Sequence, residues 1–415
     1  MSEASADNQA KYDAKLQRIR QATALQEADR VPFAPKVSGF YANGYGIDMY
    51  EMMKDLRTAE PGIRQYLADY DPDLVWPVVT YPIDPVETLG AVNIITPGPT
   101  HGLPLKSSFQ FLDGTYLEDE EFNEFLLDPT HFMLTKVMPR KNKHLGAFTK
   151  LYLREIYDQA AIMELSVFSQ DDVRKALYAL VRAGEYAQAS KEQSGYMAQL
   201  IKAAGYPMRG GTTLAPFDIY ADSLRGLIRA IQDIYERPAQ TLAVVERIAD
   251  LSVDRAVAAA RARGDICTFI PLHSGVDEFM SRENYRKFYW PGLQRIINGL
   301  IDAGITPFVF CEGKYNTRLD IISEVPKGKV IYLFEEVDIR RVKQTVGQVA
   351  CFCGNIPAAL LEFGRKERVI EETKKMLDIC APGGGFIMDC SIIMDNANHE
   401  NMQAWRQTTL EYGVY

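Results

Sequence analysis

Short apolar segments alternate with longer amphipathic segments along most of the chain, and this alternation constrains the fold more than any other feature. The apolar segments are only a few residues long, and most end at Gly, Pro, Asp or a polar cluster. Segments of this kind are typical of parallel strands that are buried on both faces. The amphipathic stretches between them have the period of an α-helix. Repeated strand–helix units therefore predict a parallel sheet.

The segments that have the composition of buried strands are Val31–Val37, Leu74–Thr80, Cys267–Leu272, Pro307–Cys311, Val330–Phe334, Val349–Cys353 and Gly385–Cys390, with a weaker one at Met208–Phe217. Helices are predicted over Asp233–Arg263, Ser281–Ala303 and Arg365–Cys380, with a break or kink at Pro291. Eight strands with helices between them predict an α/β fold of the (β/α)8 TIM-type barrel class. An open doubly wound sheet is the alternative, although no G-x-G-x-x-G motif follows a predicted strand.

We expect the 415 residues to form a single barrel domain with additions to its minimal form. Residues 1–29 are predicted to be an N-terminal helical extension. Segments 102–150 and 183–206 do not fit a minimal barrel, and no Gly/Ser/Pro-rich linker flanks them. They are therefore predicted to be inserted lids, the second of them helical.

Composition and charge exclude several classes of protein. The chain carries 46 Lys and Arg against 55 Asp and Glu, a net charge of −9, which provides no basic surface for nucleic acid. No apolar run approaches the roughly 18 to 20 residues of a membrane span, and the N-terminus lacks the apolar segment of a secretion signal. Six cysteines are too few for a disulfide scaffold. We therefore expect a cytoplasmic protein with reduced thiols, and a homodimer is left open.

Polar side chains gather where the predicted strands end, which is where the active site of a TIM barrel lies. They include Asp84, His273, Cys311, Glu312, Cys353 and Cys390. Thiolate, imidazole and carboxylate are the ligands that zinc prefers, so these positions indicate a metal or acid–base site. A small buried apolar side chain is the alternative role of each cysteine, and a core histidine that of His273. Because the chain has no H-E-x-x-H and no paired C-x-x-C, the metal hypothesis depends on position alone.

Several motifs resemble those of the uroporphyrinogen decarboxylase superfamily. They are F-M-S at 279–281, F-Y-W-P at 288–291, E-G-K-Y-N-T-R-L at 312–319, C-G-N-I-P at 353–357, G-G-G-F-I at 383–387, E-N at 400–401, D-P-D at 71–73 and V-E-T-L-G at 86–90. The resemblance spans roughly Arg30 to Tyr415, and within the superfamily the chain looks like the branch of zinc-dependent, corrinoid-linked methyltransferases. It implies a (β/α)8 barrel whose funnel opens at the C-terminal ends of the strands.

The chain departs from the family pattern at two places. The arginine-bearing element that receives the porphyrinogen carboxylates in the decarboxylases corresponds here to residues 36–42, with a single Lys36. A polyanionic tetrapyrrole substrate is therefore poorly supported. The H-x-C-G zinc element of the methyltransferases aligns with Phe310–Gly313, so that phenylalanine replaces the histidine and Glu312 the cysteine, while Cys390 falls near the last ligand. Zinc is accordingly a hypothesis, with Glu312, Cys311, Cys353, Cys390 and His273 as its candidate ligands.

The resemblance implies a methyltransferase that demethylates a small, aromatic or apolar compound and passes the methyl group to a corrinoid. In this hypothesis His273, Glu312 and Asp84 are the catalytic candidates. The predicted substrate-binding residues are Tyr41, Trp76, Phe217, Tyr220, Tyr315, Asn316 and Arg318. No histidine has an aspartate two residues before it, so the D-x-H-x-x-G motif of corrinoid carriers is absent and the corrinoid would be held by a partner protein.

Two alternatives stay open. The first is a cofactor-free decarboxylase that acts on a small carboxylic acid. It requires a cationic clamp for the carboxylate, for which Lys36, Arg209 and Arg318 are the candidates. The second is a barrel that binds a small ligand without catalysis.

Overall fold

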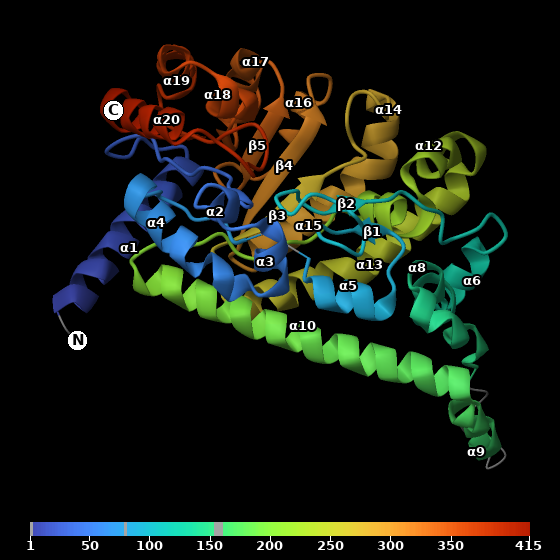
Figure 1. The fold of residues 1–415 in the computed structure, drawn as a ribbon. Helices are drawn as coiled ribbons and strands as arrows, with labels where there is room; N and C mark the ends of the chain where they lie inside the picture. Colours follow the sequence, from blue (N-terminus) through green and yellow to red (C-terminus); the bar gives the residue numbers. More distant parts are fainter. Residues whose placement is uncertain (1–2, 79–80, 153–160) are drawn as a thin grey trace.

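A computed structural model describes residues 3–78, 81–152 and 161–415 of the chain. A five-stranded parallel sheet lies at its centre, with the strands in sequence order (Figure 1). The strands are β3 (Cys267–Leu272), β4 (Thr306–Lys314), β5 (Ile331–Glu336), β6 (Cys351–Cys353) and β7 (Phe386–Ile387). Parallel strands that are adjacent in both sequence and space require a crossover between each pair, which the intervening helices supply.

Three irregular segments, around residues 31–37, 73–76 and 207–213, close this sheet into a ring. The backbone contacts that close it are those of Phe33 with Met388 beyond β7, Asp73 with Phe33, Val75 with Met208, and Thr212 with Phe269 of β3. Hydrogen bonds therefore join eight segments around one axis, which is the arrangement of the predicted TIM-type barrel.

The predicted strand bounds hold for some segments and not for others. β3 has the predicted bounds, β4 extends beyond its predicted bounds at both ends, and β5 begins one residue later and ends two residues later than predicted. Segments 31–37, 74–78 and 208–215 form isolated bridges instead of the predicted strands, because prolines and paired glycines in them interrupt the ladder. Positions 79 and 80 of the second predicted strand lie outside the described residues. β6 and β7 are shorter than predicted.

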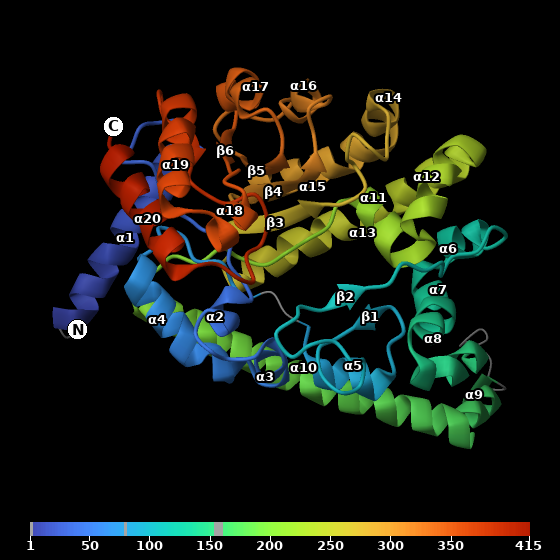
Figure 2. The same cartoon turned by 45° about the horizontal axis from the view of Figure 1, so that its top comes forward.

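Helices surround the ring and cover its outer face (Figures 1 and 2). Those that follow the third segment of the ring are α11 (Pro216–Asp218), α12 (Leu227–Glu236), α13 (Pro238–Arg263), α14 (Arg282–Asn284), α15 (Trp290–Asp302), α16 (Leu319–Ile322), α17 (Ile339–Gln344), α18 (Ala358–Phe363), α19 (Lys366–Cys380) and α20 (His399–Tyr412). The single helix predicted over 233–263 is divided at Arg237, because Pro238 has no backbone N–H for the preceding helix. A π-helical turn at Tyr285–Tyr289 directly precedes Pro291 and confirms the predicted break.

The N-terminal part of the chain supplies the remaining elements. They are α1 (Glu3–Thr23), α2 (Phe40–Asn43), α3 (Met49–Lys54), α4 (Glu60–Tyr70), α5 (Ile83–Leu89), β1 (Ile94–Ile95), β2 (Gln110–Phe111), α6 (Phe122–Leu127), α7 (Pro129–Phe132), α8 (Met138–Lys141), α9 (Ala161–Glu164) and α10 (Asp171–Ala203). Ile19 and Ala22 of α1 pack against the side chains of the barrel interior, so α1 covers one end of the barrel. The segment predicted as an inserted helix over 183–206 is mostly the second half of α10, which runs beside the barrel and extends past it (Figure 1).

The core has two layers, because side chains alternate between the two faces of each strand. One cluster fills the interior of the ring and contains Trp76, Phe269, Phe308 and Phe310. A larger cluster lies between the ring and the helices, and it contains Cys311. None of the helices in the described ranges is both long enough and apolar enough to cross a membrane.

Candidate active site

His273 lies at the C-terminal end of β3 and is held between two carboxylates. Its Nδ1 is 2.6 Å from Oδ2 of Asp222, and its Nε2 is 3.8 Å from Oε2 of Glu312. All three side chains are partly open to solvent, with 39%, 33% and 49% of their surface exposed respectively. The structure thus brings together two of the predicted catalytic residues, His273 and Glu312, at the mouth of the barrel.

A buried aspartate, Asp218, fixes the backbone beside this histidine. Its carboxylate accepts hydrogen bonds from the backbone N–H of His273 at 3.1 Å and of Ser274 at 2.9 Å. It also accepts one from the hydroxyl of Tyr289 at 2.5 Å. Asp218 and Asp222 are four residues apart in the helical segment that follows the third segment of the ring, so both carboxylates face β3.

The carboxylates keep His273 protonated at neutral pH. Burial lowers its pKa, but the hydrogen bond to Asp222 and the negative charges of Asp218, Asp222 and Glu312 outweigh burial and raise the pKa to about 9. A protonated imidazole has an N–H on both ring nitrogens. His273 can therefore donate a proton from Nε2 to a molecule at the mouth, and Asp222 stabilises the charge that it carries.

Glu335, near the C-terminal end of β5, adds a carboxylate at the same rim. Oε2 of Glu335 accepts a hydrogen bond from the backbone N–H of Gly313 at 2.6 Å. Burial raises the pKa of Glu335, the Gly313 bond opposes this rise, and the nearby Glu312 adds to it. Lys141 of α8 lies over the ring of Tyr116, 4.6 Å from its centroid, and is close enough to Asp222 for the two charges to interact. Segment 102–150 therefore reaches the neighbourhood of the site.

Two cations are buried inside the barrel below this mouth. Nζ of Lys36 lies 3.0 Å from the ring centroid of Phe310, and the guanidinium carbon of Arg209 lies 4.5 Å from that of Phe269 and 4.7 Å from that of Trp76. Burial lowers the pKa of Lys36 to about 7 and that of Arg209 to about 10. Neither cation forms an ion pair with a described carboxylate. Of the three proposed carboxylate-clamp cations, the structure therefore brings Lys36 and Arg209 together.

Asp389 lies next to Lys36 and contributes one of its two carboxylate oxygens to the backbone. Its Oδ1 accepts hydrogen bonds from the backbone N–H groups of Lys36 and Cys390, both at 2.7 Å. Its Oδ2 is buried without a partner. Burial raises the pKa of Asp389 to about 7, and the hydrogen bonds from Cys390 and Lys36 oppose this rise.

The proposed zinc ligands do not meet at one point. Cys390 donates to the carbonyl of Ile392 at 3.0 Å and Cys353 to that of Tyr332 at 3.5 Å, while Cys311 lies on the outer face of β4. Burial raises the pKa of all three thiols well above the usual value, and the thiolate is the form that binds metal. Within residues 3–78, 81–152 and 161–415, no three His, Cys, Asp or Glu side chains are arranged to hold a metal ion. The donor set therefore does not fit zinc.

The other predicted catalytic and binding residues lie elsewhere. Asp84 pairs with Lys54 at 2.6 Å, and the side-chain oxygen of Asn316 accepts from the backbone of Asp338 at 2.9 Å. Arg318 is fully buried, where it binds Asp277 at 2.8 Å and the carbonyl of Met280. These contacts give Asn316 and Arg318 roles in supporting the loop after β4.

Of the predicted aromatic wall, Trp76 alone belongs to the interior cluster. Tyr41, Phe217, Tyr220 and Tyr315 pack in the outer core. The Tyr41 hydroxyl donates to the carbonyl of Trp76 at 2.8 Å, so Tyr41 supports the wall from behind.

Sequence reasoning missed Asp218 and Asp222, the residues that fix and charge His273. Their signal is the P-F-D-I-Y-A-D sequence at 216–222, in which two acids stand four residues apart after a barrel segment. The predicted weak strand ends at Phe217, directly before these acids, so no predicted helix contains them.

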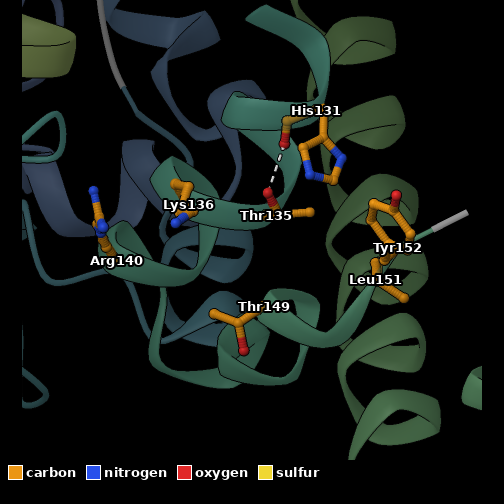
Figure 3. Close-up of a pocket in the computed structure, with 7 residues that line it drawn as sticks. All are labelled: His131, Thr135, Lys136, Arg140, Thr149, Leu151 and Tyr152. Atoms are coloured by element: carbon orange, nitrogen blue, oxygen red, sulfur yellow. Dashed lines mark hydrogen bonds between the residues drawn. The ribbon is translucent and has the colours of Figure 1, made fainter. Parts of the chain in front are cut away.

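A pocket of about 290 Å³ lies away from the mouth, beside α7 and α8 (Figure 3). Its lining residues are His131, Thr135, Lys136, Arg140, Thr149, Leu151 and Tyr152. The cations that line it are already paired, since Arg140 binds Glu121 at 2.6 Å and Lys136 lies 3.5 Å from the same carboxylate. Lys136 and Arg140 are therefore occupied by an acid of this chain.

Comparison with known proteins gives three similarities. Residues 198–412, just over half of the chain, match the family model described as uroporphyrinogen decarboxylase (URO-D). The chain is 25% identical over 177 residues to the uroporphyrinogen decarboxylase of Geobacter sp. (strain M21), and this match covers 43% of the chain and 50% of that protein. The chain thus matches only about half the length of this curated relative. Its fold is similar to that of a methyltransferase from Methanosarcina mazei, with a TM-score of 0.61 and 14% identity over 96% of this chain and 98% of that one.

Proposed function

Because the chain belongs to the uroporphyrinogen decarboxylase (URO-D) family, whose superfamily members are decarboxylases or methyltransferases, we propose that it is a methyltransferase. It would remove the methyl group of a small methylated compound and pass it to a corrinoid on a separate protein. The observation that carries this proposal is the contact between His273 Nδ1 and Asp222 Oδ2, 2.6 Å apart at the open mouth of the barrel.

The chemistry of demethylation explains why such an acid is needed. A methyl group on oxygen, nitrogen or sulfur leaves slowly, because the bond electrons must stay on the departing atom as an anion. Proton transfer from Nε2 of His273 to that atom, as the bond to carbon breaks, gives a neutral leaving group instead. Asp222 supports this step because it orients the ring through Nδ1. His273 then regains its proton from solvent, to which its side chain is 39% exposed.

The acceptor of the methyl group lies outside this chain. A corrinoid, when its carrier protein docks, supplies the nucleophilic cobalt that takes the methyl group. The exposed side chains of His273, Asp222 and Glu312 leave the mouth accessible to such a partner. The six cysteines are all free, which supports a reducing compartment such as the cytoplasm. Since the donors do not fit zinc, we assign no step to a metal ion.

Decarboxylation of a small acid is the second candidate, because Lys36 and Arg209 lie together in the barrel interior. In this reaction the bond to the carboxyl carbon breaks, carbon dioxide leaves, and His273 protonates the resulting carbanion. The cation pair would hold the carboxylate of the substrate before the bond breaks.

An assay with purified protein separates the two reactions. The protein is incubated with free cob(I)alamin and a panel of methylated aromatic compounds, and methyl transfer is followed by the absorbance of the corrinoid. Parallel incubations with small aromatic acids are analysed for released carbon dioxide. Methyl transfer that is lost in His273→Gln supports the proposal. Carbon dioxide release without methyl transfer replaces it with the second candidate, and neither activity from a folded protein favours the ligand-binding barrel.

A further inference from the structure

Among the described residues, four buried polar atoms on the interior of the barrel have no hydrogen-bond partner. They are Lys36 Nζ, Trp76 Nε1, Arg209 Nε and Asp389 Oδ2, and no more than 1% of the surface of any of these residues is exposed. They come from segments of the ring that are far apart in the sequence. Folded proteins pair nearly all of their buried polar atoms. Four unpaired atoms in one region therefore indicate a group that binds there.

The charges in this region indicate the sign of that group. Burial lowers the pKa of Lys36, the charges of Glu312 and Asp389 oppose this, and the charge of Arg209 lowers it further. Among the described residues, no carboxylate lies within ion-pair distance of Lys36 or Arg209. Their charges rest instead on the faces of aromatic rings. Burying two unpaired like charges is costly, and one anion placed between them would relieve both desolvation and repulsion. The third clamp candidate, Arg318, is already neutralised by Asp277 and lies in the outer core.

The walls of the region indicate the shape of the molecule that carries the anion. The rings of Trp76 and Phe269 meet edge to face at 5.1 Å, and those of Phe269 and Phe310 stack at 6.2 Å. Aromatic walls of this kind favour a flat, apolar ligand body.

The distance to the mouth limits the length of the ligand. Phe310 and Glu312 are two residues apart along β4, whose pairing with β5 is irregular after Cys311, so their separation along the strand is at most about 7 Å. One aromatic ring with a substituent at each end spans such a separation. A carboxylate between the cations would therefore place the opposite end of the ring near His273.

We propose that Lys36 and Arg209 bind the carboxylate of the substrate, so that the substrate is a small aromatic acid whose reacting substituent points to His273 and Glu312. The inference rests on the proposed function in one respect, which is that the reaction takes place at the mouth. The carboxylate site itself is independent of which bond is broken. On binding, the ammonium of Lys36 leaves the face of Phe310 and pairs with the carboxylate.

Calorimetric titration with two matched probes tests the site without any measurement of activity. The probes are 4-methoxybenzoate and 4-methoxybenzamide, which have similar shapes and differ in charge. We expect the acid to bind the unmodified protein at least about 10-fold more tightly than the amide, because hydrogen bonds to charged groups contribute more than neutral ones. In Lys36→Met and Arg209→Met, affinity for the acid should fall about 10- to 100-fold while affinity for the amide stays unchanged. Lys175→Met, on the exposed face of α10, is the matched control and should bind both probes as the unmodified protein does.

Thermal unfolding separates this role from a structural one. Because Lys36 is buried without a partner, Lys36→Met should melt at or above the temperature of the unmodified protein. The acid should raise the melting temperature of the unmodified protein and not that of Lys36→Met. Equal affinity for acid and amide, no binding of either, or unchanged acid binding in Lys36→Met overturns the inference. Inorganic phosphate that competes as well as the acid overturns the carboxylate assignment. Acid binding with no methyl transfer leaves the inference standing and removes the proposed function.

Discussion

The mouth and the interior of the barrel satisfy their polar groups in opposite ways. At the mouth, His273 has a carboxylate at each ring nitrogen and a third carboxylate at its backbone N–H. In the interior, Lys36 and Arg209 lie on aromatic faces, and the nearby Asp389 is not within ion-pair distance of either cation. The mouth is therefore organised before any ligand arrives, as a catalytic acid must be. The interior leaves Lys36 Nζ, Trp76 Nε1, Arg209 Nε and Asp389 Oδ2 without a hydrogen-bond partner among the described residues.

The same contrast determines the direction of the pKa shifts. Three nearby acids raise the pKa of His273 to about 9, whereas burial lowers the pKa of Lys36 to about 7. Charge dominates at the partly exposed mouth and desolvation dominates in the interior. The protein thus keeps a cation at the mouth and makes the interior cation depend on an incoming anion.

Removal of the acid at the mouth should have the largest effect. His273→Gln keeps the shape of the side chain and one donor but cannot release a proton. We expect the rate of turnover in the productive assay to fall about 100- to 10,000-fold. Affinity for 4-methoxybenzoate should stay within about twofold, since the interior site is unchanged. Loss of acid binding in this variant, measured by calorimetry, would show that mouth and interior are not separable.

Removal of the negative charge of Asp218 should reduce the free energy of unfolding. Asp218→Asn leaves one acceptor oxygen where the carboxylate accepts hydrogen bonds from His273, Ser274 and Tyr289. We expect the free energy of unfolding in urea to fall by about 1–3 kcal/mol. Asp171→Asn, at an exposed ion pair on α10, should change it by less than about 0.5 kcal/mol. Equal stability of the two variants would mean that Asp218 does not hold the end of β3.

The ionisation of His273 can be measured directly by NMR titration of its ring carbons. Its pKa in the folded protein is raised from 6.5 to about 9, so its favourable contribution to stability is fully present below pH 6.5 and is lost as the pH rises through about 9. Asp222→Asn removes the largest of the interactions that raise this pKa, which should then move toward 6.5. The alkaline limit of turnover should move to lower pH with it. An unchanged titration curve would contradict the electrostatic role of Asp222.

Strand positions and strand ends could be predicted from the sequence. Because His273 and Glu312 both follow predicted strands, the sequence placed them at the same rim of the barrel. The face on which a residue lies was less predictable. Positions 307–311 are apolar throughout, so the pattern does not show that Phe310 points inward and Cys311 outward. Lys36 and Arg209 both lie near the rings of Trp76 and Phe269 because the ring closes, and no local sequence pattern encodes that closure. The segments that contribute the two cations contain proline or glycine, which interrupt the regular pattern of a strand.

Substitution of Cys390 should have the smallest effect on turnover. Cys390 lies beside Lys36 and Asp389, so it tests whether a thiol near the interior cations takes part in the reaction. Its thiol donates to the carbonyl of Ile392 at 3.0 Å, a bond that a serine hydroxyl can also make. Cys390→Ser should therefore change turnover by less than about twofold, because no step of the proposed reaction uses the thiol. A zinc ligand at this position would behave differently, since its loss would remove stoichiometric metal, measured by mass spectrometry, together with activity. Loss of metal and of activity in Cys390→Ser would mean that the thiols, Glu312 and His273 rearrange around a metal ion. The proposal that His273 acts as the catalytic acid would then be wrong.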